Sequence, residues 1–185
     1  MRGDNRKDPV NGYPAWIEVE TFVDEMLLQE FTKNVDAYEY SSFFHKDRSG
    51  KLRAGPVWDF DQSFGNSVKW RGDLAGGWMF TRHNLFWKDL FNDDAFQRML
   101  RQRWIGLRGE SFQTHAILEW VDETADRLRE AQRRNFVRWP IIGEWLWREP
   151  PALIGIASYQ QEVDHMKQWI HERLNWMDRR FGYED

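Results

Sequence analysis

The sequence contains no cysteine. This absence excludes disulfide frameworks, thiolate zinc sites and cysteine nucleophiles, and it leaves the redox compartment open. No apolar run approaches the roughly 18 residues that a membrane-spanning helix needs. The first residues, MRGDNRKDPVNGYP, also lack the apolar segment of a signal peptide. We therefore expect no membrane span.

The sequence also has no large excess of either positive or negative charge. The 26 basic and 30 acidic residues leave a net charge of -4, and no block of like charge is long enough to form a nucleic-acid-binding tail. We expect no nucleic acid as a partner. A chain of 185 residues is long enough for one sizeable core, so we predict a single domain over residues 1–185.

Tryptophan is abundant, with 12 residues spread from Trp16 to Trp176. Large aromatic side chains are on average well buried, so we expect most of them to lie in the core. The five histidines do not show the i, i+4 spacing of a helical zinc pair, and we assign them no metal role.

Helical periodicity dominates the chain. Residues 18–34 carry apolar side chains at 3.6-residue spacing, which predicts one amphipathic helix. Further helices are predicted at 84–91, 94–106, 112–138 and 158–180, with Ser111 and Ser158 as N-caps and Pro140 as a stop signal. Within the third of these, residues 129–138 are rich in arginine and are interpreted as a solvated face. Residues 139–155 are interpreted as an ordered irregular connection.

A short β hairpin is predicted between the first two helices. Residues 38–46 and 51–59 are extended-looking runs, and residues 47–50 end in a glycine that suits the turn. Residues 67–82 contain three glycines with no periodicity, which predicts a loop that covers or flanks a site and is able to move. The predicted fold class is α+β, mainly helical.

The stretch GPVWDFDQSFGN follows the second predicted strand. Asp59 and Asp61 lie one residue apart among Trp58, Phe60 and Phe64. Two like charges so close repel, and an apolar surrounding calls for a counter-charge such as Mg²⁺ or Mn²⁺. An isolated D-x-D pattern equally fits a solvated turn or a helix cap, so the motif by itself leaves both interpretations open.

A third carboxylate, Asp36, favours a functional interpretation of the motif. Asp36 ends the first predicted helix, and 23 residues separate it from Asp59, enough for two short strands and a turn. Protein kinases place one aspartate to orient the attacking hydroxyl and another to hold magnesium. The spacing permits the same arrangement here.

The segments KNVDAYEYSSFFHKD and GPVWDFDQSFGN, together with the C-terminal SYQQEVDHMKQWIHERLNWMDRRFG, resemble the CotH family of bacterial spore-coat protein kinases. The resemblance implies an atypical kinase-like C-lobe and ATP-dependent phosphorylation of serine residues in coat or surface proteins. It implies Asp36 as the catalytic aspartate and Asp59 as the metal ligand. Asp61 is a second candidate metal ligand, and Asn66 and Glu30 are candidate cofactor-binding residues. The implied location is the spore coat or the bacterial cell surface.

The chain departs from a complete kinase in two respects. The residues before the first helix contain no phosphate-covering glycine loop and no strand-borne lysine, so we expect the N-lobe to be missing from this sequence. Ser41 stands where ordinary kinases use asparagine for a second metal. We therefore keep two readings, a piece of a longer kinase polypeptide and a domain that has become a binding module.

Three functional hypotheses follow. The first is a kinase-like phosphotransferase domain that uses Asp36 and Asp59. The second is a non-catalytic kinase-like module that binds a partner through an exposed aromatic patch. The third is a glycan-active or glycan-binding protein, in which Glu30 and Asp59 act as acid and base across a tryptophan-lined groove.

Overall fold

The computed structural model describes residues 7–82 and 86–184. It is 54% helical with one two-stranded antiparallel sheet, which confirms the predicted α+β, mainly helical class. The α-helices are α1 (Val19–Thr32), α2 (Trp87–Phe91), α3 (Asp94–Gly109), α4 (Thr114–Arg127), α5 (Arg129–Arg138) and α6 (Tyr159–Phe181). Single-turn 3-10 helices are η1 (Tyr13–Ala15), η2 (Lys69–Arg71), η3 (Phe80–Arg82) and η4 (Pro151–Leu153). No helix in this described part of the chain is both long and apolar enough to cross a membrane.

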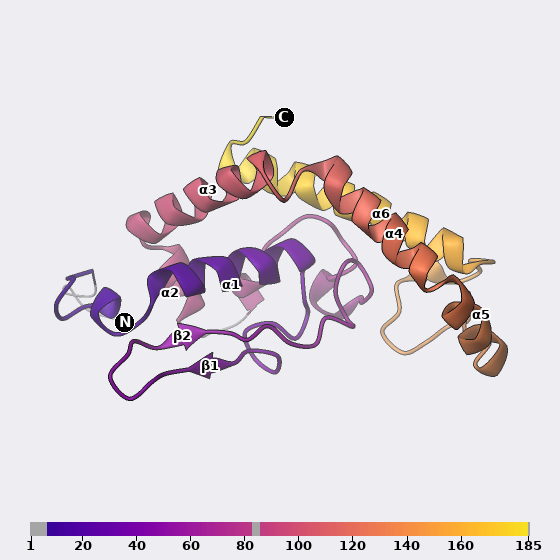
Figure 1. Ribbon diagram of the computed structural model, residues 1–185, viewed down its shortest axis with the longest axis horizontal. Helices are drawn as coiled ribbons and strands as arrows, with labels where there is room; N and C mark the ends of the chain where they lie inside the picture. Colours follow the sequence, from indigo (N-terminus) through magenta and orange to yellow (C-terminus); the bar gives the residue numbers. More distant parts are fainter. Residues whose placement is uncertain (1–6, 83–85, 185) are drawn as a thin grey trace.

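The elements form tiers around α1. Helix α1 lies between the hairpin, formed by β1 (Phe44–His45) and β2 (Arg53–Ala54), and the helices α3 and α6 (Figure 1). Helix α4 packs along α6, and α5 extends beyond it toward one end of the molecule (Figure 1). A buried ion pair joins α3 to α6, with Arg108 Nε 2.9 Å from Asp178 Oδ1. The core therefore lies around α1, α3 and α6.

Helix α1 confirms the first periodicity prediction. Its buried apolar residues are Phe22, Val23, Met26, Leu27 and Phe31. The helix ends at Lys33, which adopts a left-handed conformation with φ of 48° and donates its backbone N–H to Glu30 O. This end of α1 turns the chain directly into the segment that carries Asp36.

The hairpin is confirmed in place but is much shorter than predicted. Only Phe44 with Ala54 and His45 with Arg53 pair across the two strands. At one end, Tyr40 and Ser41 donate their backbone N–H groups to Asp36 O, so residues 36–41 form a turn instead of a strand. At the other end, Pro56 has no N–H to donate and the ladder stops before it. The motif that contains Asp59 is therefore a loop rather than the end of a strand.

The segment 71–77 is anchored by side chains from two helices. Lys33 Nζ donates to the backbone oxygens of Arg71, Leu74 and Gly76 at 2.6 to 2.7 Å. An ammonium group has three donors, and these three carbonyls use all of them. Helix α1 thus holds this loop through one buried cation.

Helix α6 holds the same segment from the other side. Arg173 donates to the backbone oxygens of Ala75 and Gly77 at 2.7 and 2.8 Å, and Trp169 Nε1 donates to Asp73 O at 2.9 Å. Arg173 also lies 3.5 Å from Glu30 Oε2 and donates to Glu30 O. We expected residues 67–82 to be able to move, and these bonds instead fix residues 71–77 between α1 and α6.

In the second half of the chain, one helix prediction is wrong. Residues 112–138 form two helices that meet at Leu128 instead of one, and the N-cap is Gln113 rather than Ser111. Helix α5 has no buried residue, which agrees with the predicted solvated face. Helix α5 ends at Arg138, before Pro140, and Ser158 caps α6 by accepting the N–H of Gln161, both as predicted. The helix predicted at 84–91 is described only from residue 86.

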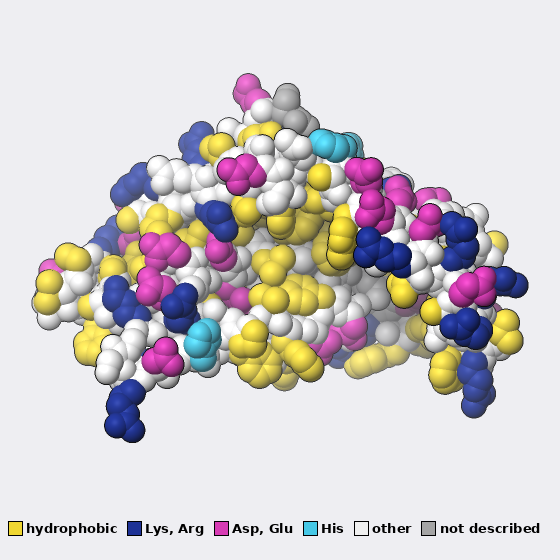
Figure 2. Space-filling model, viewed as in Figure 1, with side chains coloured by type: hydrophobic (Ala, Val, Ile, Leu, Met, Phe, Trp, Pro, Cys, Tyr) yellow, Lys and Arg dark blue, Asp and Glu magenta, His cyan; other side chains and the backbone are white. Residues whose placement is uncertain are grey.

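The tryptophans contradict the core prediction. Trp87, Trp104 and Trp169 are buried, and Trp78 and Trp176 pack partly buried against the core. The other seven are exposed by 46 to 72%: Trp16, Trp58, Trp70, Trp120, Trp139, Trp145 and Trp147. In Figure 2 hydrophobic side chains gather over the middle of the molecule, whereas Lys and Arg side chains lie mainly toward its two ends. Much of the aromatic content therefore faces solvent.

We predict that Arg173→Met destabilises the fold by about 3 to 5 kcal/mol, because it leaves the buried Glu30 carboxylate without its ion-pair partner. Urea denaturation followed by circular dichroism measures the change. Arg179→Met, an exposed arginine on the same helix, is the matched control and should change the free energy of unfolding by less than about 0.5 kcal/mol. Equal effects of the two substitutions would contradict the anchoring role of Arg173.

Candidate functional site

The site begins at Asn34, a buried residue just after α1. Its side-chain oxygen accepts the backbone N–H of Asp36 at 3.1 Å, and its side-chain nitrogen donates to the backbone oxygen of Asp59 at 3.1 Å. One amide therefore links the two segments that carry the predicted catalytic and metal-binding aspartates. The two aspartates, 23 residues apart in sequence, meet beyond the C-terminal end of α1.

The carboxylates interact electrostatically. The charge of Asp61 is the largest cause that raises the pKa of Asp59 above its usual value. Partial desolvation and the charge of Asp36 raise it further. We call Asp36, Asp59 and Asp61 the carboxylate cluster, because the Asn34 amide links the backbones of Asp36 and Asp59 and Asp61 follows two positions after Asp59. The apolar neighbours do not bury it, since Asp59, Asp61 and Trp58 are exposed.

The backbone around the carboxylate cluster is strained. Among the described residues, seven other than glycine have positive φ, and six of these lie between residues 33 and 71: Lys33, Tyr38, Asp59, Phe64, Trp70 and Arg71. Asp59 itself has φ of 59°. Such conformations cost about 1 to 3 kcal/mol each and concentrate at functional sites. Their clustering here is an independent reason to place function at this end of α1.

A lysine that the sequence did not single out contacts the carboxylate cluster. Lys69 Nζ lies 2.5 Å from Asp36 Oδ1, and the two side chains are 17% and 23% exposed. The same ammonium lies 5.2 Å from the centre of the Tyr40 ring. The residue comes from η2, in the segment that we predicted only as a loop.

A metal ion fits this donor set in a limited way. Within residues 7–82 and 86–184, no three or more His, Asp or Glu side chains are arranged to hold an ion. Magnesium often needs only one or two carboxylates, because waters and substrate phosphates supply its other ligands. Asp59 and Asp61 fit such an open site, and they do not fit a closed protein cage.

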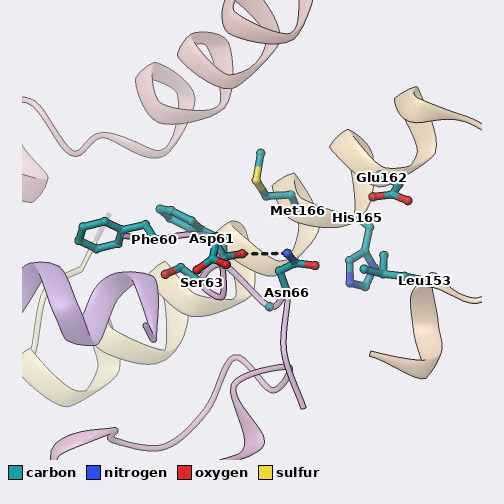
Figure 3. A pocket seen from close by; sticks show the side chains of 10 residues that line it. Phe60, Asp61, Ser63, Asn66, Leu153, Glu162, His165 and Met166 are labelled. Carbon is teal, nitrogen blue, oxygen red and sulfur yellow. Dashed lines mark hydrogen bonds between the residues drawn. The ribbon is translucent and has the colours of Figure 1, made fainter. Parts of the chain in front are cut away.

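A small pocket lies beside Asp61, with a volume of about 230 Å³. Asn66 donates its side-chain amide to Asp61 O at 2.9 Å, and Figure 3 shows Asn66 between Asp61 and His165. The buried Ser63 Oγ also belongs to the lining and has no hydrogen-bond partner. Pockets that enclose a drug-sized ligand measure about 300 to 1,000 Å³. This pocket therefore suits one side chain or group of a ligand rather than a whole nucleotide.

Glu30 lies in the core, 1% exposed. Its carboxylate accepts the Tyr38 hydroxyl at 2.9 Å and the backbone N–H groups of Met79 and Phe80 at 2.8 Å. Burial raises its pKa, and the charge of Arg173 opposes that shift. These contacts give Glu30 a structural role. Its assignment as a cofactor-binding residue stays a prediction that they do not support, and a buried Glu30 is not an accessible partner for Asp59 in glycan chemistry.

Together these features define a mainly helical domain with a carboxylate cluster beyond the C-terminal end of a central helix, next to a short hairpin. A family model described as CotH kinase protein matches residues 2–177. The chain therefore belongs to the CotH kinase protein family, and a CotH-like, kinase-related function is supported. No match was found among curated proteins.

Two residues of this site escaped the sequence analysis. Asn34 stands two positions before Asp36 in KNVDAYEYS, and its polar side chain at a helix end was the available signal. Lys69 had no signal, because the ion pair joins residues 33 positions apart through a loop without periodicity.

We predict that Asp61→Asn lowers the pKa of Asp59, because the substitution removes the largest cause of the raised value. Carboxyl ¹³C chemical shifts followed against pH measure this pKa. Asp47→Asn, in the exposed hairpin turn, is the control and should leave it unchanged.

The same shift has a stability consequence with a definite sign. Between the usual pKa of an aspartate and the raised value, the folded state binds more protons than the unfolded state, so stability falls as pH rises through this window. Asp61→Asn narrows the window. An Asp59 titration midpoint that is the same in the wild type and in Asp61→Asn would show that the two carboxylates do not interact.

Proposed function

We propose that this chain is the C-lobe-like domain, over residues 1–185, of an atypical protein kinase that transfers phosphate from ATP to serine residues of coat or surface proteins. The observation that carries the proposal is the Asn34 amide, which binds the backbones of Asp36 and Asp59 and so brings together the two aspartates that kinase chemistry requires. Family membership supports the kinase relationship.

Asp36 would act on the acceptor. Its carboxylate orients the serine hydroxyl and accepts the hydroxyl proton, while the serine oxygen forms a bond to the γ-phosphorus and the bond from phosphorus to the ADP oxygen breaks. Asp36 is partly exposed, so an acceptor hydroxyl has access to it. Its backbone is held by Asn34.

Asp59 and Asp61 would hold a divalent cation, Mg²⁺ or Mn²⁺. The ion, when bound, neutralises phosphate charge. Their mutual repulsion favours a bound cation, because a positive charge between two carboxylates relieves it. Asn66 ties the backbone at Asp61 and lines the adjoining pocket, where it would contact part of the nucleotide or of the acceptor.

The adenine ring would be bound by residues outside the site described above. The pocket beside Asp61 is small, and no phosphate-covering loop was identified before α1. We propose that an N-lobe from another segment completes the nucleotide site. Protein substrates in the spore coat or at the cell surface, without nucleic acid, remain the proposed partners.

A binding module is the second candidate, and the exposed tryptophans favour it. Trp139, Trp145 and Trp147 are 55, 67 and 72% exposed and lie within one irregular connection. Arginines stack on two of these rings, Arg138 on Trp139 and Arg148 on Trp147. Contiguous exposed apolar patches mark binding surfaces, and these three rings lie within nine residues of one another in the sequence. The experiment below separates the two candidates.

We predict that Mn²⁺ with ATP raises the thermal unfolding midpoint of the wild-type chain and that Asp59→Asn abolishes the shift. A ligand that binds only the folded form, at about 100 times its dissociation constant, adds about 2.7 kcal/mol, enough for a shift of a few degrees. Asparagine keeps the shape of aspartate and tolerates the left-handed backbone at this position. The loss therefore reports the charge.

Asp47→Asn is the matched control and should retain the wild-type shift, since this aspartate lies in the exposed turn of the hairpin. Asp36→Asn should keep the shift, because Asp36 is assigned to the acceptor hydroxyl and not to the metal ion. Because Asp59 and Asp61 would bind the ion without the N-lobe, the absence of a shift with Mn²⁺ alone as well as with Mn²⁺ and ATP would overturn the metal site and favour the binding module.

A further inference from the structure

The carboxylate cluster carries an excess of negative charge, which the Lys69 ammonium partly neutralises. Asp36, Asp59 and Asp61 together carry three negative charges when ionised, and the Lys69 ammonium is paired with Asp36. The sum of these four groups is therefore about two negative charges, which one divalent cation balances. The contact is also partly shielded, with side chains 17% and 23% exposed, so solvent screens it less than a surface pair.

We propose that Lys69 is a positioning residue of the phosphotransfer site, which orients the Asp36 carboxylate and directs a positive charge at the phosphate of the bound nucleotide. The inference rests on the proposed kinase function and deepens it. The ion pair engages Asp36 Oδ1, which leaves Oδ2 for the acceptor hydroxyl. An ammonium has three donors, so Lys69 is able to bind Asp36 and a phosphate oxygen together.

The local backbone places Lys69 with little freedom. Its N–H donates to Ser67 Oγ at 3.3 Å, and the next two residues, Trp70 and Arg71, both have positive φ. Non-glycine residues adopt this conformation only when their surroundings impose it. The turn that carries Lys69 is therefore held in an unfavourable backbone geometry rather than in a relaxed one.

The same turn is pressed against the segment before Asp36. A Cβ atom on Gly72 would lie 2.5 Å from Val35 Cγ1 and 2.8 Å from Ser67 O, so only glycine fits there. Lys33 Nζ binds Arg71 O at 2.6 Å from the same side. Lys69 and Asp36 thus come from two segments that pack tightly against each other, and this packing fixes the contact between the two side chains.

The charge of Lys69 has opposite effects on two ligands. A bare divalent cation is repelled by the ammonium, whereas a metal–nucleotide complex with net negative charge is attracted. Removal of the charge should therefore strengthen the binding of Mn²⁺ alone and weaken the binding of Mn²⁺ with nucleotide. A merely structural role predicts that both ligands bind more weakly.

The experiment measures both affinities in the same variants at low ionic strength. Mn²⁺ alone is titrated by electron paramagnetic resonance, and Mn²⁺ with a non-hydrolysable ATP analogue by calorimetry. For Lys69→Met we expect roughly three- to tenfold tighter Mn²⁺ and a similar loss for the complex, the size of a single charge acting over several ångströms in a solvent-rich site.

Two further variants make the result specific. Lys69→Arg keeps the positive charge and should leave both affinities within about twofold of the wild type. Lys51→Met removes an exposed lysine near the hairpin turn and should change neither. Thermal unfolding of each variant checks the fold, and Lys69→Gln replaces Lys69→Met if the latter does not fold.

The outcomes separate this inference from the proposed function. A wild type that binds Mn²⁺ and the complex, with both affinities lowered or both unchanged in Lys69→Met, would overturn the role of Lys69 and leave the kinase proposal standing. A wild type that does not bind even Mn²⁺ alone would overturn the metal site at Asp59 and Asp61, on which both proposals rest. Failure of both neutral variants to fold would make Lys69 a structural residue and also overturn the inference.

Discussion

The buried group of Glu30, Lys33 and Arg173 is the interaction on which the rest of this structure depends. The two cations donate to five backbone oxygens of the segment 71–77, and Arg173 also binds both the carboxylate and the backbone of Glu30. Within this segment only Gly72 is buried, and the donors come from the buried side chains of Lys33 and Arg173, so the irregular backbone is fixed against the core. The end of α1, the loop and α6 are thereby joined into one unit.

The candidate site inherits its shape from that unit. Lys33 ends α1 and anchors Arg71, and the next residue, Asn34, links the backbones of Asp36 and Asp59. Lys69 lies just before the anchored segment and pairs with Asp36. The groups with proposed chemistry therefore lie on loops and on the single turn η2, whereas the groups that hold these segments lie on or next to α-helices. This division gives loop residues a rigid support.

Sequence patterns predicted the regular parts and missed the irregular ones for a physical reason. The periodicity of α1 and α6 reflects one apolar face against one core, so it is visible locally. Helices α4 and α5 were predicted as one helix, but α4 packs on α6 whereas α5 has no buried residue, so no apolar pattern marks the break at Leu128. The tryptophans were placed in the core by residue type, although seven are exposed.

The site was predictable to a similar extent. Family resemblance pointed to Asp36 and Asp59, with Asp61 as a second candidate, and the Asn34 amide links the backbones of Asp36 and Asp59. Asn34 and Lys69 were missed, because their partners are set by loop geometry that no local pattern encodes. Glu30 was a candidate from the family resemblance, and only the folded structure shows that it is enclosed by protein donors.

The left-handed backbone of Asp59 has an evolutionary consequence. Glycine adopts φ near 59° without steric cost, so glycine would give the least strained backbone at this position. Selection for stability and selection for the carboxylate therefore oppose each other at this position, because a substitution that relieves the backbone strain also removes the negative charge. Variants selected only for thermal robustness should drift away from aspartate at this position, whereas selection that includes the chemistry should retain it.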